Sequence, residues 1–422
     1  MINKKIKKLT VTTPQGKAGE LHHESRYSFN YSTGERAAET SLVMPIRAES
    51  YSSTALPIVF AMNRPEGEQL RRITSKFSKL GGLNDMQLLS ITGDNQIGRL
   101  SYATPDSGPR AVKRPKVGLK ELLKYVASQE LFDFLVDATV ESGISGVQPK
   151  VMIPDGDKVT PVDGKATVLH SNLIVKSGGE EYPFLAQNEF LCMEAARRSG
   201  ISVPQFWLSE SGGLFVMDRF DLKEGKTLGF EDMSVLQGKQ PDVRGDYKYQ
   251  GSYENIAMAI QLFCRDQAIE SKQRLFEYVA LSIMVRNGDA HLKNFGLLYE
   301  HPTADLPPVL APLYDVVTTK VYLHTNSITG VAKADPLMAL NMHKEKNYPT
   351  RQTLLRFGAD LCHVAKPQEV IERIGTAMQQ TLLENRERID DKFFKLMSRE
   401  WDSGRMSVEP AQFFTKGHET RQ

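Results

Sequence analysis

The segment Asn287–Phe295 has the residue types and the spacing of a loop that transfers a phosphoryl group. Its sequence, NGDAHLKNF, places Asn294 five residues after Asp289, with Lys293 between them. In such loops the Asp orients or deprotonates the attacking hydroxyl, the Asn holds a metal ion, and the Lys neutralises charge on the phosphoryl group. A solvated turn between a helix and a strand would also tolerate polar residues here, so the segment alone leaves both interpretations open.

A second acidic residue, Asp315, lies inside the apolar run Ala311–Val317. A carboxylate among buried neighbours is costly unless a cation or hydrogen bonds satisfy it. Asp315 also follows the first loop along the chain, as the metal-binding Asp of a kinase follows its catalytic loop. It is therefore a candidate Mg²⁺ ligand, with an Asp in a hydrogen-bonded turn as the alternative.

Three further features precede this loop in the order found in kinases. Lys176 ends the apolar strand predicted at Asn172–Lys176, and Glu189 lies in the helix predicted next. A strand Lys paired with a helix Glu positions the α- and β-phosphates of ATP in kinases. Upstream, Gly143–Lys150 contains two glycines, and its backbone N–H groups are suited to cover phosphates. The chain has no GxxxxGK[ST] motif, which disfavours a P-loop NTPase.

The elements that must position these residues follow from the periodicity of the chain. Apolar and polar residues alternate at Lys5–Thr12 and Tyr27–Tyr31, which predicts strands in the first hundred residues. Beyond Asn255 the pattern of apolar residues is mostly helical. The sharpest break in the pattern of the whole chain lies earlier, at Pro105–Pro109. The sequence therefore predicts an α+β bilobal body preceded by a smaller N-terminal domain that carries no kinase residue.

Composition narrows the class of protein further. The chain has 422 residues, with 53 Lys and Arg against 51 Asp and Glu, so no overall field recruits nucleic acid or a membrane. The longest apolar runs, Leu56–Met62 and Tyr278–Val285, fall short of the ~18–20 residues of a membrane span. No secretory signal follows the basic start of the chain, and the three cysteines lack CxxC spacing. We expect a cytoplasmic protein with reduced thiols and no membrane partner.

A local basic cluster lies just after the predicted boundary. A solvated linker and helix start explains it as well as a contact for DNA phosphates or an acidic partner does. Its members are Arg110, Lys113, Arg114, Lys116, Lys120 and Lys124.

Three segments together resemble the HipA family of bacterial serine/threonine toxin kinases. They are Ile144–Lys150 (ISGVQPK), the loop Asn287–Phe295 and the short Tyr314–Val316 (YDV). Two segments near the start, Asn63–Gly67 (NRPEG) and Gly93–Gly98 (GDNQIG), resemble motifs of the family's amino-terminal domain. The resemblance implies a protein-kinase-like fold in three parts: a HipA-type N-terminal domain at 1–108, an N-lobe at 109–221 and an all-helical C-lobe at 222–422.

The resemblance also implies a role for each matching residue. Asp289 would be the catalytic Asp with Lys293 beside it, and Asn294 and Asp315 would bind Mg²⁺. Lys176 would contact the ATP phosphates with Glu189 as its supporting ion pair, and the backbone of Met217–Asp221 would meet adenine. For His291, structural support of the loop is an alternative to a chemical role. The further residues expected at ATP are Ser145, Gly146, Val147, Met217, Asp218, Phe220 and His291, and Ser145 is also the expected autophosphorylation site.

The family context implies partners and a biological role. Its members are toxins of toxin–antitoxin pairs, neutralised by a helix-turn-helix antitoxin (HipB-like) that binds operator DNA. Known members phosphorylate aminoacyl-tRNA synthetases and so arrest growth. Two alternatives remain open at this point. The same residues serve a kinase acting on a small molecule or lipid, and a kinase-like body can also act as a DNA-binding co-repressor with a helix-turn-helix partner.

Overall fold

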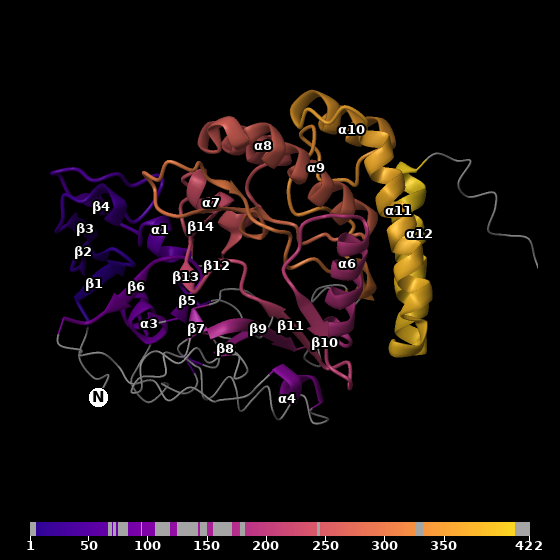
Figure 1. Ribbon diagram of the computed structural model, residues 1–422, viewed down its shortest axis with the longest axis horizontal. Coiled ribbons are helices and arrows are strands. Elements are labelled where there is room, and N and C mark those ends of the chain that lie inside the picture. The colour runs from indigo at the N-terminus through magenta and orange to yellow at the C-terminus, as the bar shows by residue number, and fades with distance from the viewer. Residues whose placement is uncertain are drawn as a thin grey trace, which may run out of the picture. The chain divides into compact units, whose positions relative to one another are not determined.

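The computed structural model describes residues 6–65, 70, 73–74, 83–93, 95–105, 119–124, 142–143, 150–154, 171–177, 182–242, 245–325 and 332–409 (Figure 1). The chain forms two compact units. The first comprises Met1–Ala186, Gln205–Tyr247 and Gly296–Pro308, and the second comprises Gln187–Pro204, Lys248–Phe295 and Val309–Gln422. These units divide the chain at other points than the three predicted domains 1–108, 109–221 and 222–422, whose boundaries stay a prediction.

The first unit begins with an antiparallel sheet of five strands. Inward-facing residues alternate along it, so Leu9, Val11, Leu21 and Phe29 are fully buried. A Cβ on Gly19 would lie 2.2 Å from the carbonyl oxygen of Asn30, so only Gly permits this close approach of two strands. The sheet order is β4-β3-β2-β1-β6. The strands are β1 Lys8–Thr13, β2 Gly16–His23, β3 Tyr27–Tyr31, β4 Tyr51–Ser53 and β6 Ser101–Ala103, and the helices beside them are α1 Ile58–Ala61 and α3 Asp85–Thr92.

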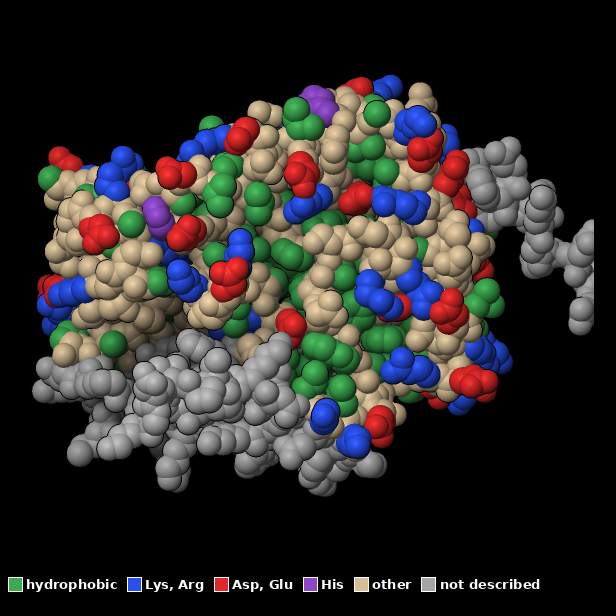
Figure 2. Space-filling view, viewed as in Figure 1, with side chains coloured by type: hydrophobic (Ala, Val, Ile, Leu, Met, Phe, Trp, Pro, Cys, Tyr) green, Lys and Arg blue, Asp and Glu red, His purple; other side chains and the backbone are tan. Residues whose placement is uncertain are grey.

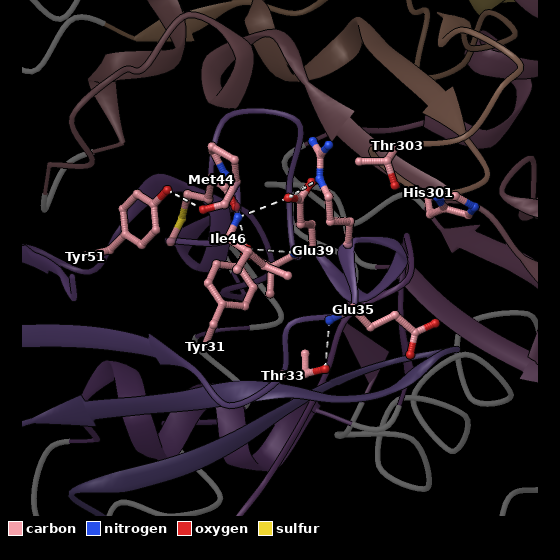
Figure 3. A network of polar contacts seen from close by, with 12 residues as sticks. Tyr31, Thr33, Glu35, Glu39, Met44, Ile46, Tyr51, His301 and Thr303 are labelled. Carbon is pink, nitrogen blue, oxygen red and sulfur yellow. Dashed lines mark hydrogen bonds and ion pairs between the residues drawn. The ribbon is translucent and has the colours of Figure 1, made fainter. Parts of the chain in front are cut away.

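The loop between β3 and β4 is fixed by its own polar contacts (Figure 3). The Tyr31 hydroxyl lies 2.9 Å from the Thr40 hydroxyl and donates to the carbonyl of Met44. The Glu39 carboxylate accepts from the backbone N–H of Ile46 at 3.0 Å, which closes the loop from the other side. These contacts fix the conformation of the loop. Its backbone N–H groups can therefore donate hydrogen bonds to other parts of the first unit.

A second sheet in the first unit carries the predicted nucleotide-binding residues. Its antiparallel strands have the order β10-β11-β9-β8, and the register places Lys176 opposite Phe215 and Met217 opposite Ile174. The face of the sheet opposite Lys176 carries one apolar cluster, formed by Leu122, Leu173, Val175, Leu214 and Val216. The elements are α4 Leu119–Lys124, β8 Lys150–Pro154, β9 Ser171–Ser177, β10 Phe206–Leu208 and β11 Leu214–Asp218, with β5 Asn95–Gln96 paired to β7 Ser142–Gly143 elsewhere in the unit.

A buried carboxylate, Glu231, joins the β3–β4 loop to the strand pair β14 (Gly229–Asp232) and β15 (Gly296–Tyr299). It accepts hydrogen bonds from the Ser41 hydroxyl and the Leu42 backbone N–H, both at 2.8 Å, and from the Tyr299 hydroxyl. Burial raises the pKa of Glu231, and these three donors oppose that shift. The N-terminal sheet and the segment that follows β11 therefore belong to one packed body.

The second unit is built from long helices. Helix α9 (Ala268–Met284) packs against α8 (Tyr253–Phe263), α11 (Pro367–Glu384) and α12 (Asp391–Val408), and α11 and α12 lie side by side (Figure 1). A Cβ on Gly404 of α12 would lie 1.9 Å from the carbonyl oxygen of Met284, so Gly lets α12 approach the end of α9. Helices α6 (Leu185–Arg198) and α10 (Arg351–Arg356) complete this group.

The mixed α/β class with a β-rich start and later helices is confirmed. The strands predicted at Tyr27–Tyr31 and Asn172–Lys176 occur within one residue of these bounds, and Glu189 lies in a helix, α6, as predicted. Residues 222–422 are not exclusively helical, because they also contain short strands. These are β12 Leu222–Lys223, β13 Lys226–Thr227, β14, β15, β16 Val309–Leu310, β17 His324–Thr325 and β18 Ala332–Lys333.

The described residues also bear on membrane-spanning helices, on the cysteines and on the distribution of surface charge. No helix in the described part of the chain is long and apolar enough to cross a membrane. All three cysteines are free and buried. On the face shown in Figure 2, acidic and basic side chains of the described residues are interspersed, as the near-zero net charge leads us to expect. Most of the predicted basic cluster 110–124 lies outside the described residues.

Candidate active site

The loop Asn287–Phe295 leaves the end of α9 through a left-handed turn at Arg286, whose φ is 60°. Asn287 then accepts a hydrogen bond on Oδ1 from the backbone N–H of Asp289 at 3.0 Å. The N–H of Gly288 donates to the Thr319 hydroxyl at 2.7 Å, and a Cβ on Gly288 would lie 2.9 Å from that same oxygen. The NGD triplet therefore turns the chain tightly and holds Asp289 at its end.

Asn294 and Asp315 come together at the other end of this loop. The backbone N–H of His291 donates to Asn294 Oδ1 at 3.1 Å, and Asn294 Nδ2 donates to Asp315 Oδ2 at 3.2 Å. Asp315 has a φ of 60°, a left-handed conformation that Asp tolerates better than most residues. Residues held in this region concentrate at functional sites, where the surrounding structure imposes the conformation. The two predicted metal ligands are thus neighbours.

The segment that carries Asp315 is anchored at Thr318 by two helices of the second unit. Asn188 of α6 accepts from the Thr318 N–H at 2.7 Å and donates to its carbonyl oxygen at 3.0 Å. The indole N–H of Trp401 in α12 donates to the Thr318 hydroxyl at 2.8 Å. Because Thr318, Asn188 and Trp401 are all fully buried, this anchor fixes the chain three residues after Asp315.

Three tyrosine hydroxyls donate hydrogen bonds to the loop Asn287–Phe295. Tyr249 donates to Asp289 Oδ1 at 2.9 Å, Tyr253 to the carbonyl of Ala290 at 3.1 Å, and Tyr314 to the carbonyl of Lys293 at 2.8 Å. No signal in the sequence predicts these three hydroxyl contacts. Tyr314 at least precedes Asp315, but Tyr249 and Tyr253 lie 40 and 37 residues away from their partners and belong to no recognisable motif.

His291 lies at the centre of the charged groups of this site. Burial lowers the pKa of His291 to about 4, with the negative charges of Asp289 and Asp315 opposing the shift and the positive charges of Lys248 and Lys293 adding to it. The ring is therefore neutral at pH 7, and it packs edge-on against Tyr249 with 5.2 Å between ring centroids. These contacts favour the structural role for His291. Lys248 is a buried cation of the same site, and no motif in the sequence marks it.

The predicted nucleotide residues of the first unit lie on β9 and β11. Lys176 and Met217 are buried, each with about 1% of its surface exposed. The backbone N–H groups of Asp218 and Arg219 donate to the carbonyl oxygens of Gln205 and Asn172, at 2.8 and 2.7 Å. These two donors are therefore occupied within the protein. Phe220 packs edge-on against Phe230, with centroids 5.3 Å apart.

Several predicted site residues are not joined by the described contacts. Lys176 lies in the first unit and the buried Glu189 in the second, so their ion pair stays a prediction. Ser145, Gly146 and Val147 lie outside the described residues, and with them the expected autophosphorylation site. The structure thus brings together Asp289, His291, Lys293, Asn294 and Asp315 in the second unit, and Lys176, Met217, Asp218 and Phe220 in the first.

The side chains of Asn294 and Asp315 fit a divalent cation of the hard, oxygen-preferring class. Mg²⁺ is bound in proteins by one or two carboxylates together with other oxygen donors and substrate phosphates. Asp315 supplies a carboxylate, and the Oδ1 of Asn294 keeps one of its two lone pairs after accepting from His291. The hydrogen bond between the two side chains places these donors side by side.

Two family models cover most of the chain. The model of the HipA N-terminal domain matches residues 9–103, and that of the HipA-like C-terminal domain matches residues 142–385. The chain belongs to the HipA family.

Individual relatives share about 30% sequence identity or less with parts of this chain. A protein of Haemophilus influenzae called "Putative kinase" is 30% identical over 207 residues, which are 46% of this chain and 57% of that protein. "Putative kinase Y4mE" of Sinorhizobium fredii is 27% identical over 316 residues, 70% of this chain and 72% of that protein. This chain therefore spans little more than half the length of the first relative and nearly three quarters of the second.

The fold also matches a solved structure. A chain of the Shewanella oneidensis MR-1 complex of HipA, HipB and operator DNA superposes with a TM-score of 0.59, covering 94% of this chain and 96% of that chain. At 16% sequence identity, this similarity establishes a shared fold.

Proposed function

We propose that this chain is an ATP-dependent serine/threonine protein kinase that acts as the toxin of a toxin–antitoxin pair. The observation that carries the proposal is the contact between Asn294 and Asp315 in the site that also contains Asp289. Phosphoryl transfer needs a residue that orients the hydroxyl and oxygen ligands for a metal, and this site contains both. The two relatives named as kinases support the same reaction class.

In the proposed reaction the acceptor hydroxyl donates a hydrogen bond to the Asp289 carboxylate, which orients the oxygen and takes up its proton as the bond to the γ-phosphorus of ATP forms. The bond between that phosphorus and the oxygen that bridges it to the β-phosphate breaks in the same step, and ADP leaves. Lys293 and the buried Lys248 supply positive charge near the phosphoryl group. Asp315 and Asn294 would hold Mg²⁺, which supplies charge neutralisation at the phosphate oxygens when bound. His291, being neutral, supports the loop without adding charge.

On the nucleotide side, Lys176 would contact the ATP phosphates, with Glu189 as its ion-pair partner. The segment Met217–Asp221 would border adenine. Because the N–H groups of Asp218 and Arg219 are occupied, adenine recognition there would depend on carbonyl oxygens and apolar contact. Ser145, Gly146 and Val147 would cover the phosphates, with Ser145 as the autophosphorylated residue.

The proposed partners rest on family membership and on the Shewanella complex. That complex contains HipA, HipB and operator DNA, so we propose a HipB-like helix-turn-helix antitoxin that contacts operator DNA on behalf of this chain. The proposed substrate is a protein of translation such as an aminoacyl-tRNA synthetase, whose phosphorylation would arrest growth.

The test is transfer of label from γ-labelled ATP to proteins of a bacterial lysate by the purified chain. Replacing Asp289 or Asp315 by Asn should reduce transfer about 10²–10⁴-fold, because the first variant loses the hydroxyl-orienting carboxylate and the second a metal ligand. Expression of either variant should no longer arrest growth. The exposed Asp266→Asn is the matched control and should behave as wild type. Undiminished transfer in both site variants, or label only on lipid or small molecules, would contradict the proposal.

A further inference from the structure

The hydrogen bond from Tyr249 to Asp289 is not explained by the fold of the loop alone. Tyr253 and Tyr314 bind carbonyl groups of the loop, and these contacts fix its backbone. Tyr249 instead donates to Oδ1 of the carboxylate itself, at 2.9 Å. A phenol is protonated at neutral pH and is a good donor to a carboxylate. The contact therefore acts on the group that the proposed reaction uses.

The Tyr249 side chain is itself held in place. Its ring meets the His291 ring edge-on at 5.2 Å, with 75° between the ring planes. The Lys248 ammonium lies 5.3 Å from the centroid of the same ring, and the Lys346 ammonium donates to the Tyr249 carbonyl at 3.3 Å. These contacts restrict the rotamers of the Tyr249 side chain, so its hydroxyl has a defined position.

A carboxylate has two oxygens and can accept several hydrogen bonds. With Oδ1 bound to Tyr249, the rotation of the Asp289 carboxylate about its last bond is restricted, and Oδ2 can accept from another donor. In kinase chemistry that donor is the acceptor hydroxyl. Restricting the orientation of a reacting group before the substrate arrives reduces the entropy lost on the way to the transition state.

We propose that Tyr249 is a positioning residue for phosphoryl transfer, which holds the Asp289 carboxylate with Oδ2 directed to the acceptor hydroxyl. The inference rests on the proposed kinase function. Tyr249 touches neither ATP nor the reacting phosphorus in this role, so its removal affects the rate of transfer and leaves nucleotide affinity unchanged.

The chain supplies matched controls, because three tyrosines donate one hydroxyl hydrogen bond each to the same loop. Tyr249→Phe, Tyr253→Phe and Tyr314→Phe remove the same atom and differ in whether the acceptor is the carboxylate or a backbone carbonyl. We expect Tyr249→Phe to lower kcat about tenfold, with KM for ATP changed less than about twofold. The other two variants should keep kcat within about threefold of wild type.

Stability separates positioning from a structural role. Tyr253 is about 1% exposed and Tyr249 is only half-buried, so Tyr253→Phe should lower the melting temperature more than Tyr249→Phe does. The order of the variants by activity should therefore be the reverse of their order by stability. A structural role for Tyr249 would give the same order in both.

A double-mutant cycle tests whether Tyr249 acts through Asp289. In an Asp289→Ala background, Tyr249→Phe should cause no further loss of the residual rate. The inference is overturned if Tyr249→Phe matches the two control variants in kcat, if it raises kcat, or if it lowers the rate again in the Asp289→Ala background. If instead the wild type transfers no phosphoryl group, or transfers it as fast without Asp289, then the proposed function itself fails.

Discussion

Arg219 and Asp221 form a bidentate ion pair inside the first unit. Arg219 Nε lies 2.9 Å from Asp221 Oδ1, and Nη2 lies 2.6 Å from Oδ2. Both ends of the pair also bind the segment before β6: Gly98 donates its N–H to Asp221 at 2.7 Å, and Arg219 donates to the carbonyl of Gln96 at 2.6 Å. The GDNQIG motif thus binds two residues of the predicted adenine-binding segment Met217–Asp221.

Removing one partner of this pair should destabilise the protein strongly. Asp221 is fully buried and Arg219 about 8% exposed, so Asp221→Ala leaves a buried guanidinium without its counterion. Such a loss typically costs about 3–5 kcal/mol in the free energy of unfolding. Denaturation in urea, followed by circular dichroism, measures the change. The exposed pair of Glu270 and Arg274 is the control, since Glu270→Gln should cost less than about 1 kcal/mol. Equal losses in the two variants would contradict the prediction.

Gly98 should not tolerate a side chain. Its φ is 90°, and an added Cβ would lie 3.3 Å from both the backbone nitrogen and the carbonyl oxygen of Phe230. Gly16 has a φ of 115°, but an added Cβ there would meet nothing within 4 Å. Gly16→Ala therefore reports backbone strain alone, about 1–3 kcal/mol. Gly98→Ala should lower the melting temperature further, because crowding adds to the strain. Equal melting temperatures of the two variants would contradict this prediction, because they would show that Phe230 moves aside with no loss of stability.

Glu194 should make the stability of the second unit depend on pH in the acid range. Burial acts to raise the pKa of Glu194, but hydrogen bonds and positive charge from Arg197 and Arg198 outweigh it, so the pKa lies below its usual value. A carboxyl whose folded-state pKa is depressed stabilises the folded state above its unfolded pKa of about 4.3 and loses this contribution as the pH falls further. Melting temperature should therefore fall less steeply below about pH 4.3 in Glu194→Gln than in wild type. Parallel curves for the two proteins would refute this prediction.

The parts of the molecule that the sequence predicts best are those encoded by near neighbours. The strand Tyr27–Tyr31 follows from alternation, and the placement of Asp289 and Asn294 in one loop follows from a five-residue spacing. Asp315 is recognisable because an acid stands in an apolar run. In each case the signal lies within a few residues of the feature it predicts.

Features made by distant residues could not be predicted in this way. Tyr249 meets Asp289 across 40 residues, and nothing in its own neighbourhood marks it. The break at Pro105–Pro109 predicts a domain boundary, which stays a prediction, but it gives no sign of the hydrogen bond between Gly98 and Asp221, which lie 123 residues apart in the same unit. Periodicity reports which face of an element is buried, and it carries no information about which other element covers that face.

The partners of Glu231 are widely spaced in the order in which the ribosome makes them. Ser41 is synthesised 190 residues before Glu231, and Tyr299 follows 68 residues after it. N-terminal segments generally fold first during synthesis. Here Ser41 and Leu42, in the loop after β3, cannot form their hydrogen bonds to Glu231 until more than half of the chain has been translated. Contacts of such large sequence separation form slowly, because the entropy of closing the loop is lost before any contact energy is gained. Ser41 and Leu42 therefore lack this carboxylate partner until Glu231 has been synthesised, and Glu231 in turn meets its third donor, Tyr299, only after β15 has been synthesised.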